Sequence, residues 1–240
     1  MNKMIESLSS AFQFILKDKI IMTLSSFPVM IGGALYYFLG SWVLNNVLVW
    51  GKQWISERMS DGFGVFIYWI LAALLWIVFF FIVNWTFVLV VSLIASPFND
   101  AISGRVLKKL QGQATDSLPF TIKRLFSKSL FTIFNELKKI SFIVLMTTLA
   151  FLISMIPVLA PISIVISAIL LSVEFLDYSW SRKELKFSEC LSDTRRFIFP
   201  YGISGGAFTF LMAIPIVNLF FLPIGVIYYT VLHHNLNIKG

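Results

Sequence analysis

Hydrophobic positions dominate this chain in four long stretches that contain no Asp, Glu, Lys or Arg. They are 32, 38, 34 and 42 residues long, and each exceeds the roughly 20 residues that an α-helix needs to cross about 30 Å of hydrocarbon. None shows the alternation over about 10 residues that is typical of membrane β-strands. The pattern predicts an all-α integral membrane protein. The stretches are Ile20–Gly51, Gly62–Asn99, Ile140–Val173 and Phe197–Ile238.

Lys and Arg gather in the connections between these stretches, and their distribution predicts a topology. Residues 1–19 hold 3 of them, residues 52–61 hold 2, residues 100–139 hold 8 and residues 174–196 hold 5. Cytoplasmic loops carry an excess of Lys and Arg. The N-terminus and both richly basic connections are therefore predicted to face the cytoplasm, and the first two stretches, 20–51 and 62–99, are predicted to be full spans.

The third and fourth stretches must then leave the membrane on the side where they entered it. Residues 140–173 are too few for two full spans, and they are interrupted by Pro157 and Pro161, which end or kink a helix. Residues 197–238 repeat an Ile-Pro pair at Pro215, with Pro223 beyond it. We expect two half-penetrating, re-entrant hairpins and a cytoplasmic C-terminus, with 1–240 forming a single membrane domain. The likeness of the two hairpins indicates either an internal repeat or chance similarity between apolar sequences.

Two polar segments have the periodicity of amphipathic helices. Residues 1–19 predict a helix that either lies in the membrane interface or packs on the rest of the protein. Residues 100–139 predict a basic helix that Gly112 ends, then a second from about Pro119 to Ser141, whose cations are expected to meet anionic lipid. The apolar positions of the first helix are Met4, Ile5, Leu8, Ala11, Phe12, Ile15 and Leu16.

Composition excludes a soluble domain and argues against catalysis. The chain is 58% hydrophobic and 13% charged, with a formal charge of +7, and we expect no nucleic-acid partner. His233 and His234 are adjacent, so on a helix they diverge by about 100° and do not share a metal easily. Cys190 is the single cysteine. Phosphate loops, zinc-ligand pairs and nucleophile elbows are not found in the sequence, so we expect no enzyme, cofactor or metal.

Three groups of residues resemble the CysZ family of bacterial sulfate permeases. The first is the motif Ser96-Pro97-Phe98-Asn99-Asp100. The second is Asp177-Tyr178 with Arg182, Phe187 and Arg195, and the third is Ile214 to Leu219 with Pro223 and Val226. The resemblance implies an oligomeric inner-membrane protein with two long membrane helices and two half-penetrating hairpins. It also implies passage of sulfate into the cell for cysteine biosynthesis.

One departure from the family concerns anion recognition. Members carry a Gly-apolar-Arg element a few residues before a proline in the first membrane stretch, and it resembles a sulfate-binding motif. The matching residues before Pro28, Lys19 to Phe27, contain neither the glycine nor the arginine. The alternatives are a non-transporting membrane scaffold or assembly protein, or a permease for another small solute.

Candidate site residues follow from charge and from the hairpins. The cations beside the hairpin entrances, Arg182, Lys183, Arg195 and Arg196, are the anion-binding candidates. Pro161, Asn218 and Pro223 are pore or hairpin-tip candidates, because a half-helix that begins near mid-membrane offers unpaired N–H groups to an anion; turning the hairpin is the alternative role. Asn99 and Asp100 are expected to cap the basic helix that follows.

Overall fold

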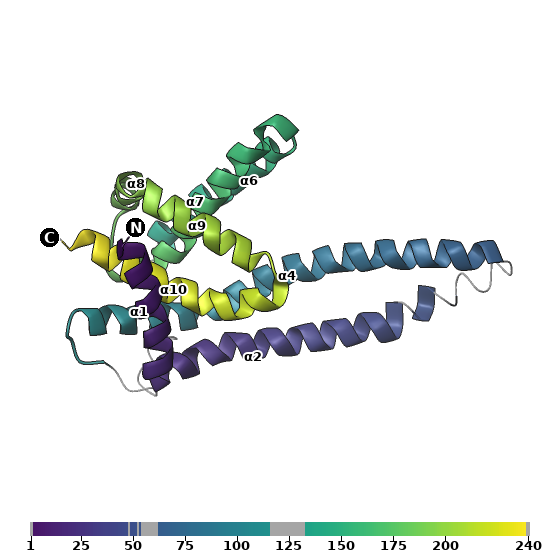
Figure 1. Cartoon of the computed structure of the whole chain (residues 1–240), viewed down its shortest axis with the longest axis horizontal. Helices are drawn as coiled ribbons and strands as arrows, with labels where there is room; N and C mark the ends of the chain where they lie inside the picture. The colour runs from purple at the N-terminus through teal and green to yellow at the C-terminus, as the bar shows by residue number, and fades with distance from the viewer. Residues whose placement is uncertain (1, 48, 52, 54–61, 116–132, 239–240) are drawn as a thin grey trace. The chain divides into compact units, whose positions relative to one another are not determined.

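The computed structural model describes residues 2–47, 49–51, 53, 62–115 and 133–238, and every regular element in these ranges is helical (Figure 1). The all-α prediction is confirmed. The elements are α1 (Asn2–Lys17), α2 (Lys19–Trp42), the π-helical turn η1 (Val43–Val47), α4 (Gly62–Leu110), α6 (Ile133–Ser154), the 3₁₀ turn η3 (Pro157–Leu159), α7 (Ala160–Arg182), α8 (Phe187–Arg196), α9 (Ile198–Met212) and α10 (Pro215–Asn237).

The chain divides into two compact units. One unit comprises Met1–Ser26 with Pro97–Gly240, and the other comprises Phe27–Ser96. The second unit contains most of α2, η1 and the first part of α4. Its large apolar side chains are exposed along both helices, including Tyr37, Phe38, Trp42, Trp50, Phe66, Trp69 and Trp76. Exposed aromatic and aliphatic surface of this extent is typical of helices that face lipid.

Two helical segments of the described chain are long and apolar enough to cross a bilayer. Lys19–Gly51 corresponds to the first predicted span, and Pro157–Arg182 corresponds to the second arm of the first predicted hairpin. That arm is longer than its uncharged run, because α7 continues through Glu174 and Asp177 to Arg182. The predicted second span, 62–99, lies within the 49-residue helix α4.

Both predicted Ile-Pro turns are present. Ile156 and Ile214 are extended, with φ/ψ of −100/109° and −91/113°, as expected for a residue before proline. Pro157 and Pro215 then start the next helical segment, where a missing N–H costs nothing. The second prolines differ: Pro161 lies in the first turn of α7, whereas Pro223 lies inside α10.

Two of the hairpin-tip candidates, Asn218 and Pro223, lie within α10, after the Ile-Pro turn. Asn218 donates its backbone N–H to the Ile214 carbonyl oxygen over 2.9 Å, so it belongs to the first turn of α10. Pro223 interrupts one helical hydrogen bond without ending the helix, because the residues after it are buried continuously through Val226, Tyr229 and Leu232. Packing of this face outweighs the local cost of proline.

The larger unit has its core where α7, α9 and α10 meet. The rings of Phe175 and Tyr229 stack with centroids 5.5 Å apart, and Phe208 packs against both. Gly205 allows α9 to approach α7 so closely that a Cβ at this position would overlap the Ala168 carbonyl oxygen. The close approach brings buried polar groups of the three helices within hydrogen-bonding distance.

The N-terminal helix packs on the rest of the protein and also keeps an apolar face exposed. One face of α1 packs on α10, burying Ser7 and Ala11, and Lys3 Nζ donates to the Asn235 carbonyl oxygen over 2.6 Å. A second face is apolar and exposed at helical spacing. It consists of Ile5, Leu8, Phe12 and Leu16, and it is suited to an apolar boundary such as the membrane interface.

Basic residues follow Asp100 as predicted, but they continue α4 rather than start a new helix. Gly112, with φ +67°, follows the end of this helix, as expected. The predicted second basic helix, with Lys123, Arg124 and Lys128, lies mostly outside the described residues.

Candidate functional site

Arg182, one of the four predicted anion-binding cations, is held by Asp100. Its Nη2 donates to the Asp100 carboxylate over 2.6 Å and to the Asp100 carbonyl oxygen over 2.9 Å. The two side chains are 18% and 14% exposed. Charge-assisted hydrogen bonds in such partly buried places are worth about 1.5–3 kcal/mol. Arg182 therefore ties the end of α7 to α4.

The motif from Ser96 to Asp100 does not cap a helix, contrary to expectation. α4 passes through Ser96, Pro97, Phe98, Asn99 and Asp100 without a break, because the following apolar positions of the same helix are buried and stabilise its continuation. Asn99 is 2% exposed. Its Nδ2 donates to the Tyr178 hydroxyl over 3.5 Å, and its Oδ1 has no hydrogen-bond partner in the described part of the chain.

The other three cations lie on or beside α8. Burial lowers the pKa of Lys183, and the negative charge of Asp193 partly offsets this effect. Arg195 and Arg196 are exposed in the last turn of α8, where cations interact favourably with the helix dipole. The Arg196 guanidinium also lies over the Phe197 ring, 5.0 Å from its centroid. Among the four, Arg182 is committed to an internal carboxylate, whereas Arg195 and Arg196 are accessible.

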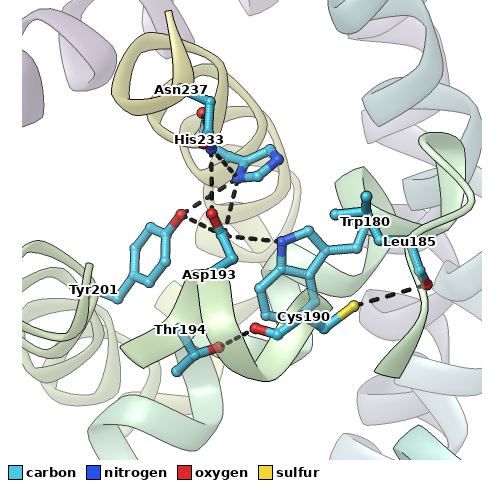
Figure 2. A network of polar contacts seen from close by, with 8 residues as sticks. All are labelled: Trp180, Leu185, Cys190, Asp193, Thr194, Tyr201, His233 and Asn237. Atoms are coloured by element: carbon cyan, nitrogen blue, oxygen red, sulfur yellow. Dashed lines mark hydrogen bonds and ion pairs between the residues drawn. The ribbon is translucent and has the colours of Figure 1, made fainter. Parts of the chain in front are cut away.

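A single carboxylate, that of Asp193 on α8, joins four helices in the buried polar network of Figure 2. It accepts hydrogen bonds from Trp180 Nε1 on α7 over 3.1 Å and from the Tyr201 hydroxyl on α9 over 3.0 Å. From α10 it meets Asn237 Nδ2 at 3.2 Å and His233 Nδ1 at 3.2 Å. The network fastens α8 to the bases of both hairpins.

Asp193 is ionised within this network. Burial by itself would raise the pKa of its carboxyl, but hydrogen bonds from His233, Asn237 and Tyr201 and the nearby charge of His233 outweigh that effect and hold the pKa below its usual range. His233 is 2% exposed, and its Nε2 has no hydrogen-bond partner among the residues that the structure describes.

A second set of polar groups joins the hairpins deeper in the unit. Ser172 Oγ donates to the Tyr201 carbonyl oxygen over 2.7 Å and lies 2.8 Å from the Tyr229 hydroxyl. Ser204 Oγ and the Tyr228 hydroxyl lie 2.6 Å apart. Thr230 Oγ1 and Ser103 Oγ, 2.9 Å apart, connect α10 to α4. Such interhelical hydrogen bonds are typical of helices packed in a membrane.

Asp18 forms the third polar cluster, between α1 and α2. Its carboxylate is 2.6 Å from Arg105 Nε and 2.7 Å from Lys109 Nζ, and it accepts from the Ile20 N–H over 2.9 Å, which caps α2. Burial acts to raise the pKa of Asp18, but the hydrogen bonds from Arg105, Lys109 and Ile20 outweigh it and lower the pKa to about 2.

None of these three clusters was found from the sequence, although a partial signal exists. Tyr228, Tyr229 and Thr230 are consecutive polar residues within an otherwise apolar stretch, and polar residues in such stretches usually face the protein interior. Asp193 and Asp18 lie in charged connections, where one carboxylate is not distinguished from its neighbours. Each also has a partner far away in the sequence, His233 for Asp193 and Arg105 for Asp18.

The chemistry of these groups is that of hydrogen bonding and charge, without a nucleophile–base arrangement. In the described ranges, no group of three His, Cys, Asp or Glu is placed to hold a metal ion. Long apolar helices and hydrogen bonds between buried hydroxyls of neighbouring helices are typical of an α-helical membrane protein.

The chain belongs to the family described as Sulfate transporter CysZ/Etoposide-induced protein 2.4, which matches residues 7–223. Three relatives are named Sulfate transporter CysZ. The protein of Vibrio cholerae serotype O1 is 25% identical over 221 residues, covering 86% of this chain and 81% of the relative. That of Pseudomonas paraeruginosa is 27% identical, covering 73% of both chains. That of Pseudomonas aeruginosa is 27% identical, covering 85% of this chain and 80% of the relative.

Proposed function

We propose that this chain is a sulfate permease of the bacterial inner membrane that supplies sulfate for assimilation and cysteine biosynthesis. The observation that carries the proposal is its similarity, over most of its length, to relatives named as sulfate transporters. The buried hydroxyls between α7, α9 and α10 support it, because a divalent anion that leaves water needs donors along its path.

Anion capture is assigned to the accessible cations beside the second hairpin. Arg195 and Arg196 immediately precede α9, and guanidinium offers paired donors that match two oxygens of an oxyanion. Lys183 adds a third, half-buried charge. Arg182 is assigned a structural role, because its Nη2 donates to both the carboxylate and the carbonyl oxygen of Asp100. The first turns of α7 and α10 offer unpaired N–H groups toward the hairpin tips.

The proposed topology has cytoplasmic termini, full spans at 20–51 and 62–99, and hairpins at 140–173 and 197–238 that enter and leave on the cytoplasmic side. The charge distribution supports this arrangement. We also propose a homo-oligomer, since irregular backbone at membrane depth must be covered by protein. A mass above that of one chain in lipid nanodiscs is the expected observation, and a monodisperse monomer there would contradict it.

Uptake of labelled sulfate into proteoliposomes of the purified protein tests the proposed function. We expect uptake above that of protein-free vesicles, with saturation as external sulfate rises. Uptake at low sulfate should fall about tenfold in the Arg195→Gln, Arg196→Gln double variant and recover as sulfate is increased. Absence of uptake by a folded wild-type protein at millimolar sulfate would contradict the proposal.

A permease for a different small solute is the second candidate, favoured by the stretch Lys19–Phe27. This stretch lacks the Gly-apolar-Arg element described above, so anion selectivity here depends on other groups. Competition in the same vesicles distinguishes the two candidates. Inhibition of labelled sulfate uptake by unlabelled sulfate in preference to other solutes supports the sulfate permease, and preferential uptake of another labelled solute supports the alternative. A scaffold that transports no solute would show no uptake of either labelled compound.

A further inference from the structure

A cavity of about 200 Å³ lies between α6, α7 and α8 in the larger unit, away from the hydroxyls that join α7, α9 and α10. Its lining is apolar apart from a few groups near α8, among them Asp177, Cys190 and Thr194. The α6 wall is formed by Phe142, Ile143 and Met146, and the α7 wall by Ile166, Ile169, Leu170 and Val173, with Leu191 on α8.

The ends of the cavity are built by specific contacts. Phe142 on α6 and Phe187 on α8 meet edge to face, with ring centroids 5.4 Å apart. Trp180 contributes to the lining, and its indole N–H is the one that donates to Asp193 (Figure 2). Cys190 and Thr194, drawn in the same figure, also face the cavity. The wall of the cavity at α8 is thus the reverse side of the Asp193 network.

The cavity borders a surface that is itself apolar and exposed. Val144 and Leu145, on α6 between two lining residues, are 58% and 59% exposed, and Val165 on α7 is 58% exposed. In a membrane helix such side chains face hydrocarbon rather than water. Apolar cavities of about 150 Å³ stay dry and accept small hydrocarbons. The acyl chain of a membrane lipid can therefore fill this cavity.

We propose that this cavity binds one acyl chain of a phospholipid whose phosphate meets Arg195. Charge supports this choice of occupant, because α8 contributes Cys190, Leu191 and Thr194 to the lining and carries the exposed guanidinium of Arg195 directly after Thr194. Arg195 lies four residues after Leu191, so both are on the same face of α8. The chain would lie between α6 and α7, and the phosphate would lie at the C-terminal end of α8. Arg195 is also assigned to sulfate capture under the proposed function, so lipid binding is measured without sulfate, and the cavity variants test the lipid site separately from transport.

Native mass spectrometry of the purified protein with phosphatidylglycerol, in sulfate-free buffer, tests the proposal. Met146→Trp fills the cavity, and Leu145→Trp places the same side chain on the adjacent exposed position. We expect wild type and Leu145→Trp to retain phosphatidylglycerol alike and Met146→Trp to bind it about tenfold more weakly, the scale expected from losing about two buried methylenes. Arg195→Gln should weaken binding more than Arg196→Gln, whose guanidinium stacks on Phe197.

A second pair of variants distinguishes a loss of lipid binding from a folding defect. Met146→Gln makes the cavity polar without enlarging the side chain, and Leu145→Gln is its control; helix content by circular dichroism should be unchanged in both. Equal lipid retention by the Met146 and Leu145 variants, or none by wild type, overturns the proposal. Loss of subunits from the assembly in Met146→Trp alone also overturns it, because the cavity would then be filled by a second copy of this chain.

Discussion

The Asp18 carboxylate pairs with two cations, Arg105 and Lys109. The stability of the protein should therefore be sensitive to substitution of Asp18 and to acid. Its pKa falls from 3.8 to about 2 on folding, so its stabilising contribution is complete above about pH 4 and is lost as the pH falls toward 2. We expect Asp18→Asn to lower the free energy of unfolding by about 2 kcal/mol at pH 7, because it also leaves Arg105 and Lys109 without their counter-charge.

Thermal unfolding in mild detergent between pH 3 and pH 7 measures this effect. The wild-type midpoint should fall as the pH is lowered, and the decline should be shallower in Asp18→Asn. Glu6→Gln, an exposed acid on α1, is the matched control and should behave as wild type. Identical midpoints for Asp18→Asn and wild type at pH 7 would show that the cluster adds nothing to stability.

Arg182 and Asp100 should behave as a structural pair. Arg182→Gln and Asp100→Asn are each expected to destabilise the protein by about 1.5–3 kcal/mol, and the double variant should cost less than the sum of the two, because the partners interact directly. Thermal midpoints of the four proteins give this comparison. If Arg182→Gln instead weakens sulfate binding while Asp100→Asn does not, Arg182 is an anion ligand.

Arg195 and Arg196, in contrast, should affect sulfate binding and have little effect on stability. Replacing both with Gln is expected to raise the dissociation constant for sulfate about tenfold, the equivalent of 1.4 kcal/mol, because each exposed guanidinium contributes charge-assisted donors. The free energy of unfolding should stay within about 0.5 kcal/mol of the wild-type value, as for other surface substitutions. Isothermal titration with sulfate measures the first quantity. An unchanged affinity for sulfate would show that these arginines do not bind the anion.

At the residue level, the sequence indicated which positions carry charge but not which charges are already satisfied. Arg182 and Arg195 look equivalent in sequence, since both are arginines beside a hairpin entrance. They differ in the structure because α4 continues past Asp100 and places that carboxylate against Arg182. Long-range pairs of this kind, as between Asp193 and His233, have no local signature.

At the level of elements, close helix packing depends on single glycines. A Cβ on Gly205 would overlap the Ala168 carbonyl oxygen and Ser172 Oγ, whereas one on Gly206 would lie 4.0 Å from Ala168 Cβ. We expect Gly205→Ala to destabilise the protein by about 3 kcal/mol, as overpacking does. Gly206→Ala should be neutral or slightly stabilising. The two thermal midpoints provide the measurement, and equal midpoints would contradict the close approach of α9 to α7.

The helices and the Ile-Pro turns could be predicted, because both follow from local chemistry: the length of apolar runs and the conformation that proline imposes on the preceding residue. Helix ends that are set by tertiary packing could not be predicted. α4 passes through Pro97, and α10 through Pro223, because the helical residues that follow each proline are buried, Ala101 and Ile102 in α4 and Ile224–Leu232 in α10. Local cost predicts a break at these places, and tertiary burial outweighs it.

For the whole molecule, cysteine labelling from the periplasm tests the topology. In a Cys190→Ser background, a cysteine at Met59, which lies outside the described residues, should react readily with a membrane-impermeant maleimide. Cysteines at Pro161 and Leu219 should react poorly if, as proposed, the hairpins enter from the cytoplasmic side. Ready reaction at Pro161 would instead place the start of α7 at the periplasm, as a full span of Pro157–Arg182 would require.

The packing of α1 on α10 joins two helices that are far apart in the sequence, since Lys3 and Asn235 are separated by 232 residues. Lys3 Nζ bonds the Asn235 carbonyl oxygen, and Asn235 Nδ2 donates to Ser7 Oγ over 3.2 Å. Until α10 has been synthesised and inserted, α1 has no partner for the face that contains Ser7 and Ala11. Its other apolar face can hold it at the bilayer surface during that interval. Chains that stop before residue 215 would leave this face of α1 without its partner.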